Sequence, residues 1–297
     1  MNQELSIEEK IALKQWGLDD DALAVHPTVY RNDLLDGQVF LISGGGTGMG
    51  RTLAYLVARL GAEVMICGRR QEMLDETAVG IRDRLGKTIG TYAMSIRDED
   101  QVSALMDATW ERFGQVNCLV NNAGGQFVQN AIDFSKKGWR SVIDLNLNGT
   151  WYMMQGTARR WVQQKKRDGN IVTIAAAVDR GLPGMAHTAA SRAGVIALTK
   201  TLAVEWAEHG IRLNCIGAGA IESNGFNNYK PENVAGLFRT NPMLRAGDVQ
   251  DVAEAVVYLT APSGKYITGE TINIDGGMVL WGEFWPAGMP EYFRPPA

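Results

Sequence analysis

The residues best suited to chemistry in this sequence lie together at positions 187–195, in the run HTAASRAGV. Thr188 and Arg192 are four residues apart, so in a helix they share one face, one turn apart. A threonine hydroxyl donates hydrogen bonds but is far too weak an acid to exchange a proton near neutral pH, and arginine keeps its charge. With His187 beside them, the pair predicts a site that stabilises negative charge on a substrate oxygen, without a dedicated acid.

Two asparagines in the run DLNLNGT (144–150) form a second candidate group. Asn146 and Asn148 interrupt a segment of helical periodicity, where asparagine is unfavourable. We expect them to help hold the substrate, or else to mark a water-binding kink. Two structural alternatives apply to the first group: His187 could simply pack at a helix end, and Thr188 could be the N-cap of that helix.

The run SGGGTGMGR (43–51) has the composition of a phosphate-binding turn. It lies between a strand and a helix, where glycines permit a tight turn and the free N–H groups of the helix attract a pyrophosphate. The alternative is a plain strand–helix turn. We expect a dinucleotide to contact Gly44, Gly46, Thr47, Gly48, Met49 and Gly50.

The end of the next strand predicts which dinucleotide binds. An NAD site usually has Asp or Glu there for the ribose hydroxyls, whereas this strand ends in Cys67-Gly68-Arg69-Arg70. Guanidinium groups can clamp a 2′-phosphate with paired hydrogen bonds. The cofactor predicted is therefore NADP(H), the alternative being that Arg69 and Arg70 are solvated surface charges.

Regular alternation of strands and helices positions these groups. Continuous apolar strands separated by helical segments indicate a parallel sheet that is covered on both faces. We predict an α/β fold with a Rossmann-type doubly wound parallel sheet of about seven strands and helices on both faces. The predicted organisation is an N-terminal extension (1–36) with one helix near 6–16, a single domain (37–279), and an extended aromatic and proline-rich tail (280–297).

Composition narrows the class of protein. The net charge of −4 over 297 residues gives no general attraction to nucleic acid or anionic membranes, and no apolar run is long enough to span a bilayer. The acidic start lacks the basic and apolar regions of a signal peptide, so we expect a cytoplasmic protein. The three cysteines (Cys67, Cys118 and Cys215) lie in separate apolar strands, which predicts buried reduced thiols and no metal site.

These motifs together resemble the short-chain dehydrogenase/reductase family, from about Asp36 to Gly277. The resemblance rests on the glycine turn, on NNAG (121–124), on DLNLNGT, on GNIVTI (169–174) and on SRAGVIALTKTLAVEWAEHGIRLNCI (191–216). Within the family, NNAGGQF and HTAASRAGV look most like the peroxisomal trans-2-enoyl-CoA reductase and 2,4-dienoyl-CoA reductase branch. This resemblance implies that the cofactor is also contacted by Ser95, Ile96, Asn122, Ala123, Gly124, Arg192, Gly219 and Ile221.

Departures from the usual family pattern shape the functional expectation. Asn146 matches the family's Asn, but alanines 175–177 stand where Ser is usual, Thr188 where Tyr is usual, and Arg192 where Lys is usual. The resemblance then implies NADPH-dependent reduction of the C=C bond of an enoyl-CoA or 2,4-dienoyl-CoA, with Asn146, Asn148, His187, Thr188 and Arg192 in the catalytic site. Asp179 and Arg180 lie where substrate-facing residues occur in the family, or else form a surface ion pair.

Two other functions stay open at this point. One is a carbonyl reductase or 3-hydroxyacyl-CoA dehydrogenase whose acid is Tyr229 or Tyr292, and the other is a catalytically silent NADP-binding protein. The resemblance also implies a homo-oligomer, a dimer or tetramer, formed through helices at 137–164 and 188–209. The tail residues Trp281, Phe284 and Trp285 seal either a neighbour's site or their own core.

Overall fold

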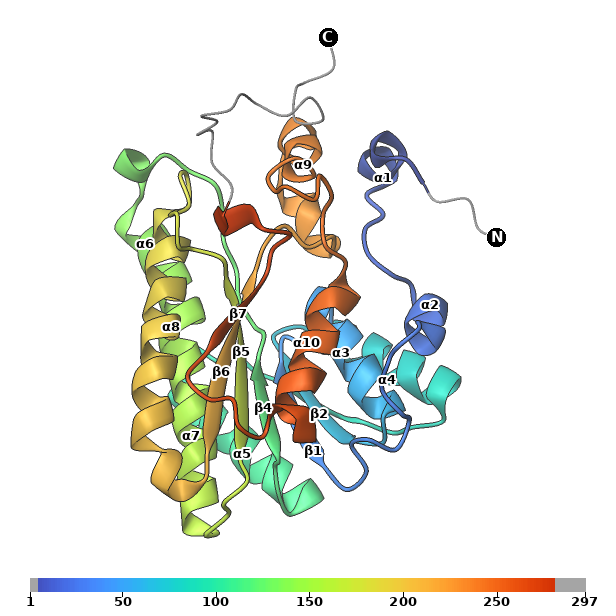
Figure 1. Cartoon of the computed structure of the whole chain (residues 1–297), viewed down its shortest axis with the longest axis vertical. Coiled ribbons are helices and arrows are strands. Elements are labelled where there is room, and N and C mark those ends of the chain that lie inside the picture. The colour runs from blue at the N-terminus through green and yellow to red at the C-terminus, as the bar shows by residue number, and fades with distance from the viewer. Residues whose placement is uncertain (1–4, 281–297) are drawn as a thin grey trace.

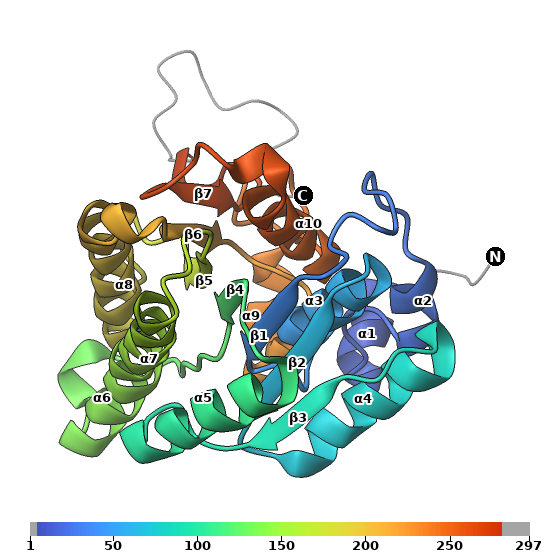
Figure 2. The ribbon, with the colours of Figure 1, turned by 90° about the horizontal axis from the view of Figure 1, so that it is seen from below.

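The computed structural model describes residues 5–280, apart from the side chains of Asn228 and Glu232. At the centre of this part is one seven-stranded parallel sheet in the order β3-β2-β1-β4-β5-β6-β7 (Figures 1 and 2). This confirms the predicted doubly wound α/β fold. The strands are β1 (Val39–Ser43), β2 (Glu63–Gly68), β3 (Gly90–Ala93), β4 (Cys118–Asn121), β5 (Asn170–Ala176), β6 (Arg212–Ala218) and β7 (Thr271–Ile274).

Helices cover both faces of the sheet, as Figure 2 shows. One face is covered by α3 (Gly48–Arg59), α4 (Gln71–Leu85) and α10 (Val249–Thr260). The other is covered by α5 (Glu99–Phe113), α7 (Gly149–Gln163) and α8 (Ala186–Glu205), and α6 (Lys136–Ile143) packs against α8. Each layer has its own buried apolar cluster, and the strands contribute side chains alternately to the two clusters.

The register of the sheet brings the candidate turns to one edge. Ser43 at the end of β1 lies beside Cys67 on β2 and Asn121 on β4. The glycine turn after β1, the arginines after β2 and the NNAG turn after β4 therefore leave the sheet side by side, at the carboxyl edge where ligands gather in such folds.

The long helix expected at 137–164 is present but not uniform. One π-helical turn (Asp144–Asn148) joins α6 to α7. Such turns carry one residue more than an α-helical turn and are frequent at functional sites. Both candidate asparagines, Asn146 and Asn148, lie in this turn.

The N-terminal extension contains more structure than its sequence suggests. Besides α1 (Ile7–Leu13) it has α2 (Asp20–Val25), so the expectation of one helix is wrong. A further helix that the strand–helix alternation does not predict, α9 (Pro231–Leu237), follows β6 and lies beside α1, whereas α2 lies beside α3 and α4 (Figure 1). The expectations for Trp281, Phe284, Trp285 and Tyr292 fall outside the described residues.

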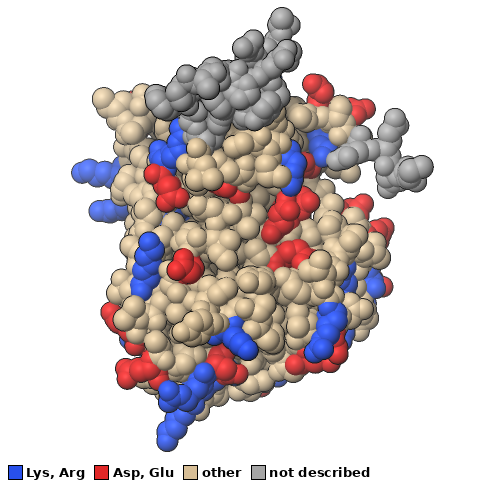
Figure 3. Space-filling view, in the orientation of Figure 1, with Lys and Arg blue, Asp and Glu red and all other residues tan. Residues whose placement is uncertain are grey.

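Three further observations bear on the class of protein. Cys67, Cys118 and Cys215 are free and buried, as predicted, and burial raises the pKa of each thiol. Over residues 5–280, no helix is long and apolar enough to cross a bilayer. Figure 3 shows that acidic and basic side chains are interspersed on one face of the molecule, which agrees with the small net charge.

Candidate active site

The turn after β1 requires glycine at specific positions. Gly44 has φ +69° and Gly48 has φ +53°, in the left-handed region that favours glycine. A Cβ atom on Gly50 would stand 2.2 Å from the Gly44 carbonyl oxygen. The backbone of the turn is thus drawn tightly against the start of α3, as a phosphate-binding turn requires.

The start of α3 offers free backbone donors beside this turn. Thr47 is the N-cap, and its side chain makes no capping hydrogen bond with any described residue. The first N–H groups of the helix therefore stay available, and the helix dipole adds positive potential there. A pyrophosphate fits this arrangement, so the residues present are suited to a nicotinamide dinucleotide.

Hydrogen bonds fasten the glycine turn to the turn after β4. Asn122 Nδ2 donates to the carbonyl oxygens of Ser43 (3.1 Å) and Gly44 (3.0 Å). In return, Ser43 Oγ accepts from the N–H groups of Asn122 (3.1 Å) and Ala123 (3.0 Å). Asn122 therefore holds the loop rather than presenting its amide to a ligand. Ser43 is not among the residues predicted from the sequence, although its position directly before Gly44 is a usable signal.

Arg192 reaches this edge of the sheet from α8. Its guanidinium passes so close to Gly124 that a Cβ there would lie 2.1 Å from Nη2. The residue is 9% exposed, and Nη1 is buried without a hydrogen-bond partner among the described residues. Burial lowers the pKa of Arg192 to about 10, so it stays charged at neutral pH. A buried cation with a free donor is suited to bind hydroxyl groups or a negatively charged oxygen.

Asn146 connects the turn after β4 to α8. Its Oδ1 accepts the Gly125 N–H (2.9 Å), and its Nδ2 donates to the Gly125 carbonyl (3.0 Å) and to Ser191 Oγ (3.4 Å). The side chain is 0% exposed. Asn146 therefore positions the NNAGG backbone. Asn148 lies outside this network, because its Nδ2 donates to Asp144 Oδ1 (2.9 Å) one turn back on its own helix.

Thr188 and His187 form a buried pair at the start of α8. The helix begins at Ala186 with Met185 as N-cap, so the alternative that Thr188 is the N-cap is wrong. The Thr188 N–H donates to His187 Nδ1 (2.7 Å), and Thr188 Oγ1 lies 3.2 Å from the same nitrogen. Because Nδ1 accepts the amide hydrogen, it carries no proton, and the geometry assigns the imidazole proton to Nε2.

Aromatic rings enclose His187. Its ring centroid lies 4.5 Å from those of both Phe127 and Phe134. Burial lowers the pKa of His187, against a smaller opposing effect of the Met185 carbonyl, so the imidazole stays neutral. Its Nε2 is buried and finds no partner within residues 5–280. The packing alternative for His187 is therefore observed, together with a free donor.

Tyr229 also approaches the NNAGG turn, from the segment after β6. Its hydroxyl accepts a hydrogen bond from Gln126 Nε2. Burial raises the pKa of Tyr229, and the bond from Gln126 opposes this only in part. A phenol of raised pKa is poorly suited to donate protons at neutral pH.

The other candidate residues lie around the same edge. Arg69 and Arg70 are exposed after β2, and neither forms an ion pair with another described residue. Ser95 is half-buried, and its N–H donates to Gln101 Oε1 (2.9 Å). Asp179 accepts from Asn273 (3.4 Å) instead of pairing with Arg180. Of the remaining positions, Gly46 lies against α4, Met49 and Ile221 pack in the core, Ile96 contacts Gly149, and Gly219 abuts Asp275.

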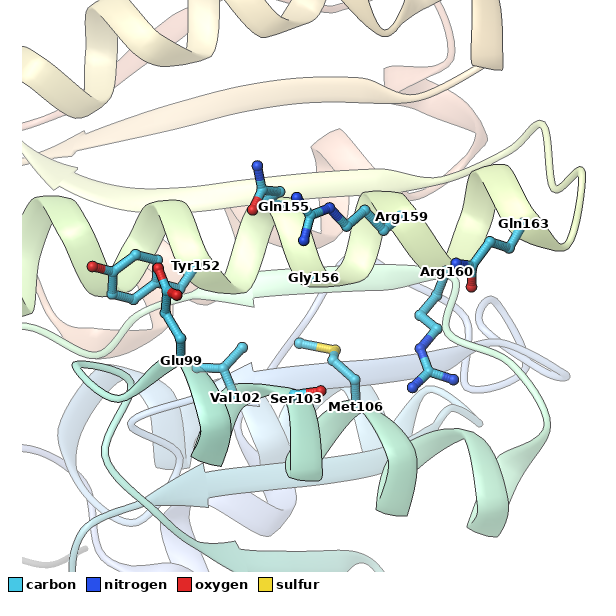
Figure 4. Close-up of a pocket in the computed structure, with 10 residues that line it drawn as sticks. All are labelled: Glu99, Val102, Ser103, Met106, Tyr152, Gln155, Gly156, Arg159, Arg160 and Gln163. Carbon is cyan, nitrogen blue, oxygen red and sulfur yellow. The ribbon is translucent and has the colours of Figure 1, made fainter.

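A surface groove between α5 and α7 lies apart from these residues. Figure 4 shows its lining, which includes Val102, Met106, Tyr152 and Arg159 and none of the candidate site residues. We assign it no part in the site.

Comparisons with known proteins show the family to which the chain belongs. A family model described as Enoyl-(Acyl carrier protein) reductase matches residues 44–279. A probable 2,4-dienoyl-CoA reductase [(2E)-enoyl-CoA-producing] from Bacillus subtilis is 36% identical over 83% of this chain and 98% of its own length. A peroxisomal 2,4-dienoyl-CoA reductase [(3E)-enoyl-CoA-producing] from Danio rerio is 32% identical over 88% of each chain.

A solved structure is similar in sequence and fold. The citronellol catabolism dehydrogenase AtuB of Pseudomonas aeruginosa PAO1 has a TM-score of 0.76 and 34% identity, covering 85% of this chain and 99% of that one. With the family model, the seven-stranded sheet and the glycine turn in agreement, the chain belongs to the short-chain dehydrogenase/reductase family, among relatives named 2,4-dienoyl-CoA reductase.

Proposed function

We propose that this protein reduces the C=C bond of an enoyl-CoA or 2,4-dienoyl-CoA thioester with NADPH. The observation that carries the proposal is the pair formed by Arg192 and Thr188. Arg192 is a buried cation whose Nη1 has no hydrogen-bond partner in the described part of the chain, and Thr188 is a weak donor where the family usually has a phenol. Such a pair stabilises a negative oxygen but does not exchange a proton with an alcohol.

Reduction of an unsaturated thioester requires that kind of stabilisation. The turns after β1 and β4 would hold the dinucleotide, and its nicotinamide would supply the hydride. When hydride adds to Cβ, the electrons of the C=C bond move toward the thioester oxygen, which becomes negative. Arg192 contributes fixed positive potential, and the Thr188 hydroxyl donates to the thioester oxygen once its single proton turns away from His187 Nδ1, which still accepts the Thr188 N–H. Cα then takes a proton from solvent, the carbonyl re-forms, and no side chain changes its charge.

The choice of NADPH rests on the end of β2. Arg69 and Arg70 are exposed and without ion-pair partners in the described part of the chain. Two free guanidinium groups favour a 2′-phosphate, and no carboxylate stands there to repel it.

The names of the relatives support the acyl-CoA substrate. Two of them, at 36% and 32% identity, are named as 2,4-dienoyl-CoA reductases. The alternative of a carbonyl reductase is supported by the names of two other similar proteins, the dehydrogenase AtuB and a 3-oxoacyl-[acyl-carrier-protein] reductase from Thermotoga maritima (32% identical), and would need Tyr229 or Tyr292 as its acid. The raised pKa of Tyr229 argues against that role.

A substrate panel tests the proposal. The full chain is assayed for NADPH oxidation with crotonyl-, decenoyl- and dienoyl-CoA and with matched 3-oxoacyl-CoA and ketone substrates. We expect turnover of the unsaturated thioesters and similar rates from Tyr229→Phe. Turnover of ketones alone, abolished by Tyr229→Phe, would favour the carbonyl reductase. Binding of NADPH without oxidation by any thioester would favour a silent protein.

Two accompanying expectations are part of the proposal. We infer a homo-oligomer that assembles through α7 and α8, as the family does, and a cytoplasmic location. Sedimentation of the purified chain and its localisation in cells measure these directly.

A further inference from the structure

The segment 221–240, between β6 and α10, touches both turns of the proposed cofactor site. A Cβ on Gly48, in the glycine turn, would lie 3.5 Å from the Ser223 Cβ. Further along the segment, the Tyr229 hydroxyl accepts the hydrogen bond from Gln126, just after the NNAGG turn. Any outward movement of this segment would uncover the start of α3 and the turn after β4.

An ion pair joins the N-terminal extension to this segment across 212 positions of sequence. Lys10 Nζ donates to both carboxylate oxygens of Glu222, at 2.9 and 3.0 Å. The Gly17 N–H donates to Glu222 Oε1 as well (3.3 Å). Both side chains are mostly buried, at 18% and 16% exposed, so the pair is better shielded from solvent than an ordinary surface ion pair.

An aromatic contact adds to the ion pair. Trp16 is 6% exposed, with its ring centroid 5.3 Å from that of Phe226 and 6.3 Å from that of Phe238. Ile7 and Ile11 of α1 pack against the same small cluster, which is separate from the two cores of the sheet. The Lys14 carbonyl accepts from Asn227 Nδ2 (3.2 Å).

These contacts can break without unfolding the rest of the protein. No residue of α1 is fully buried, so its attachment depends on the partly buried Ile7 and Ile11, on Trp16 and on the Lys10–Glu222 pair. Segments held by few buried contacts open locally, with a free energy below that of global unfolding. Weakening one contact should therefore change the opening of segment 221–240 before it changes the stability of the whole fold.

We propose that residues 6–17, the N-terminal strap, hold segment 221–240 over the glycine turn and thereby set how tightly the protein retains its dinucleotide. Glu222 is a positioning residue in this arrangement, acting through Ser223 on the phosphate-binding turn. The second half of the proposal rests on the proposed cofactor site, whereas the holding of the segment does not.

Hydrogen exchange of the cofactor-free full chain tests the holding directly. Lys10→Met and Trp16→Ala should each raise the exchange of amides in 221–240 by about tenfold, equivalent to about 1.4 kcal/mol of opening free energy. Amides of β4 and β5 should be unchanged, which shows that the fold is intact. The matched control is Asp33→Asn, which breaks the exposed Arg31–Asp33 pair of the same extension.

A charge exchange tests the ion pair itself. The double variant Lys10→Glu with Glu222→Lys should restore most of the protection that either single variant loses. Wild-type exchange of 221–240 in both Lys10→Met and Trp16→Ala would overturn the strap. The proposal would also be overturned if the double variant exchanged the amide hydrogens of 221–240 as fast as the single variants.

Fluorescence titration with NADPH tests the consequence for the cofactor. The strap variants should bind NADPH several-fold more weakly through faster release, and the Asp33→Asn control should not. Faster exchange with an unchanged dissociation rate would overturn the link to retention. If wild-type protein itself does not bind NADPH, the proposed function fails while the exchange result still decides whether the strap holds the segment.

Discussion

The Arg192 guanidinium occupies the space that a side chain on residue 124 would need, since a Cβ on Gly124 would stand 2.1 Å from Nη2. Gly124 and Arg192 are 68 residues apart, on the turn after β4 and on α8, and the absence of one side chain makes room for the other. The relation gives a test in which stability and function separate.

The Gly124→Ala variant should lose function more than stability. The displaced atom is the end of a flexible side chain, so the guanidinium can swing away at small cost, well below the roughly 1–3 kcal/mol of overpacking a rigid core. We expect NADPH affinity and turnover to fall by about tenfold or more, as when a binding group is misplaced. Fluorescence titration and thermal unfolding measure the two effects. The control is Gly236→Ala, where an added Cβ would meet nothing within 4 Å.

Arg192 itself should show its role in the pH profile. Its pKa, lowered by burial to about 10, keeps the wild-type charge through the neutral range, and the charge is lost only as pH rises through that value. In Arg192→Lys the same burial acts on an ammonium of ordinary pKa about 10.4 and lowers it, so activity should decline at lower pH than in the wild type. Arg192→Met should lose about a hundredfold in kcat at every pH. If Arg192→Met had the wild-type kcat at every pH, Arg192 would have no part in the mechanism.

Asn146 should matter to the fold as well as to the site. Replacement by Ala removes two hydrogen bonds to the half-buried Gly125 backbone, which together should lower the unfolding free energy by about 1–3 kcal/mol. Asn148→Ala removes a single bond along one helix and should cost clearly less. Urea unfolding of the two variants compares them. If both variants lost the same unfolding free energy, the hydrogen bonds to Gly125 would contribute little to stability.

His187 should make stability depend on pH. Its folded-state pKa is lowered, so the unfolded chain binds more protons, and stability should decrease as pH falls through the ordinary histidine value of about 6.5. His187→Phe should remove this part of the dependence, because a third ring between Phe127 and Phe134 carries no proton. Denaturant unfolding at pH 5 and pH 7.5 measures it.

The fold was predictable because its signals are local. The alternation of strands and helices is observed, and two of its helices are Gln71–Leu85 and Val249–Thr260. In the second, Asp248 and Asp251 form a capping box, which fixes the start of the helix from within four residues of sequence. The spacing of Gly44, Gly48 and Gly50 likewise predicted the phosphate-binding turn, because the need for glycine there arises within the turn itself.

What the sequence did not predict depends on contacts between distant residues. Nothing near Lys10 indicates that its partner is Glu222, and the sequence predicted only an N-terminal extension with one helix. The hydrogen bonds of Asn146 were equally hidden, because they depend on how the π-helical turn directs its side chain toward Gly125. The helix α9 was not predicted, because seven residues are too few to show a helical periodicity that distinguishes them from a loop.

The π-helical turn at Asp144–Asn148 lets one continuous helix serve two different neighbours. Before the turn, α6 packs against α8, and after it, α7 packs against α5. One extra residue shifts the angular phase of everything that follows by about 100°. Deleting a single residue there would make α6 and α7 one regular helix, but either the α8 contact of α6 or the α5 contact of α7 would then be turned away from its partner. The packing of both helices therefore constrains the length of this segment, and homologues should keep its number of residues.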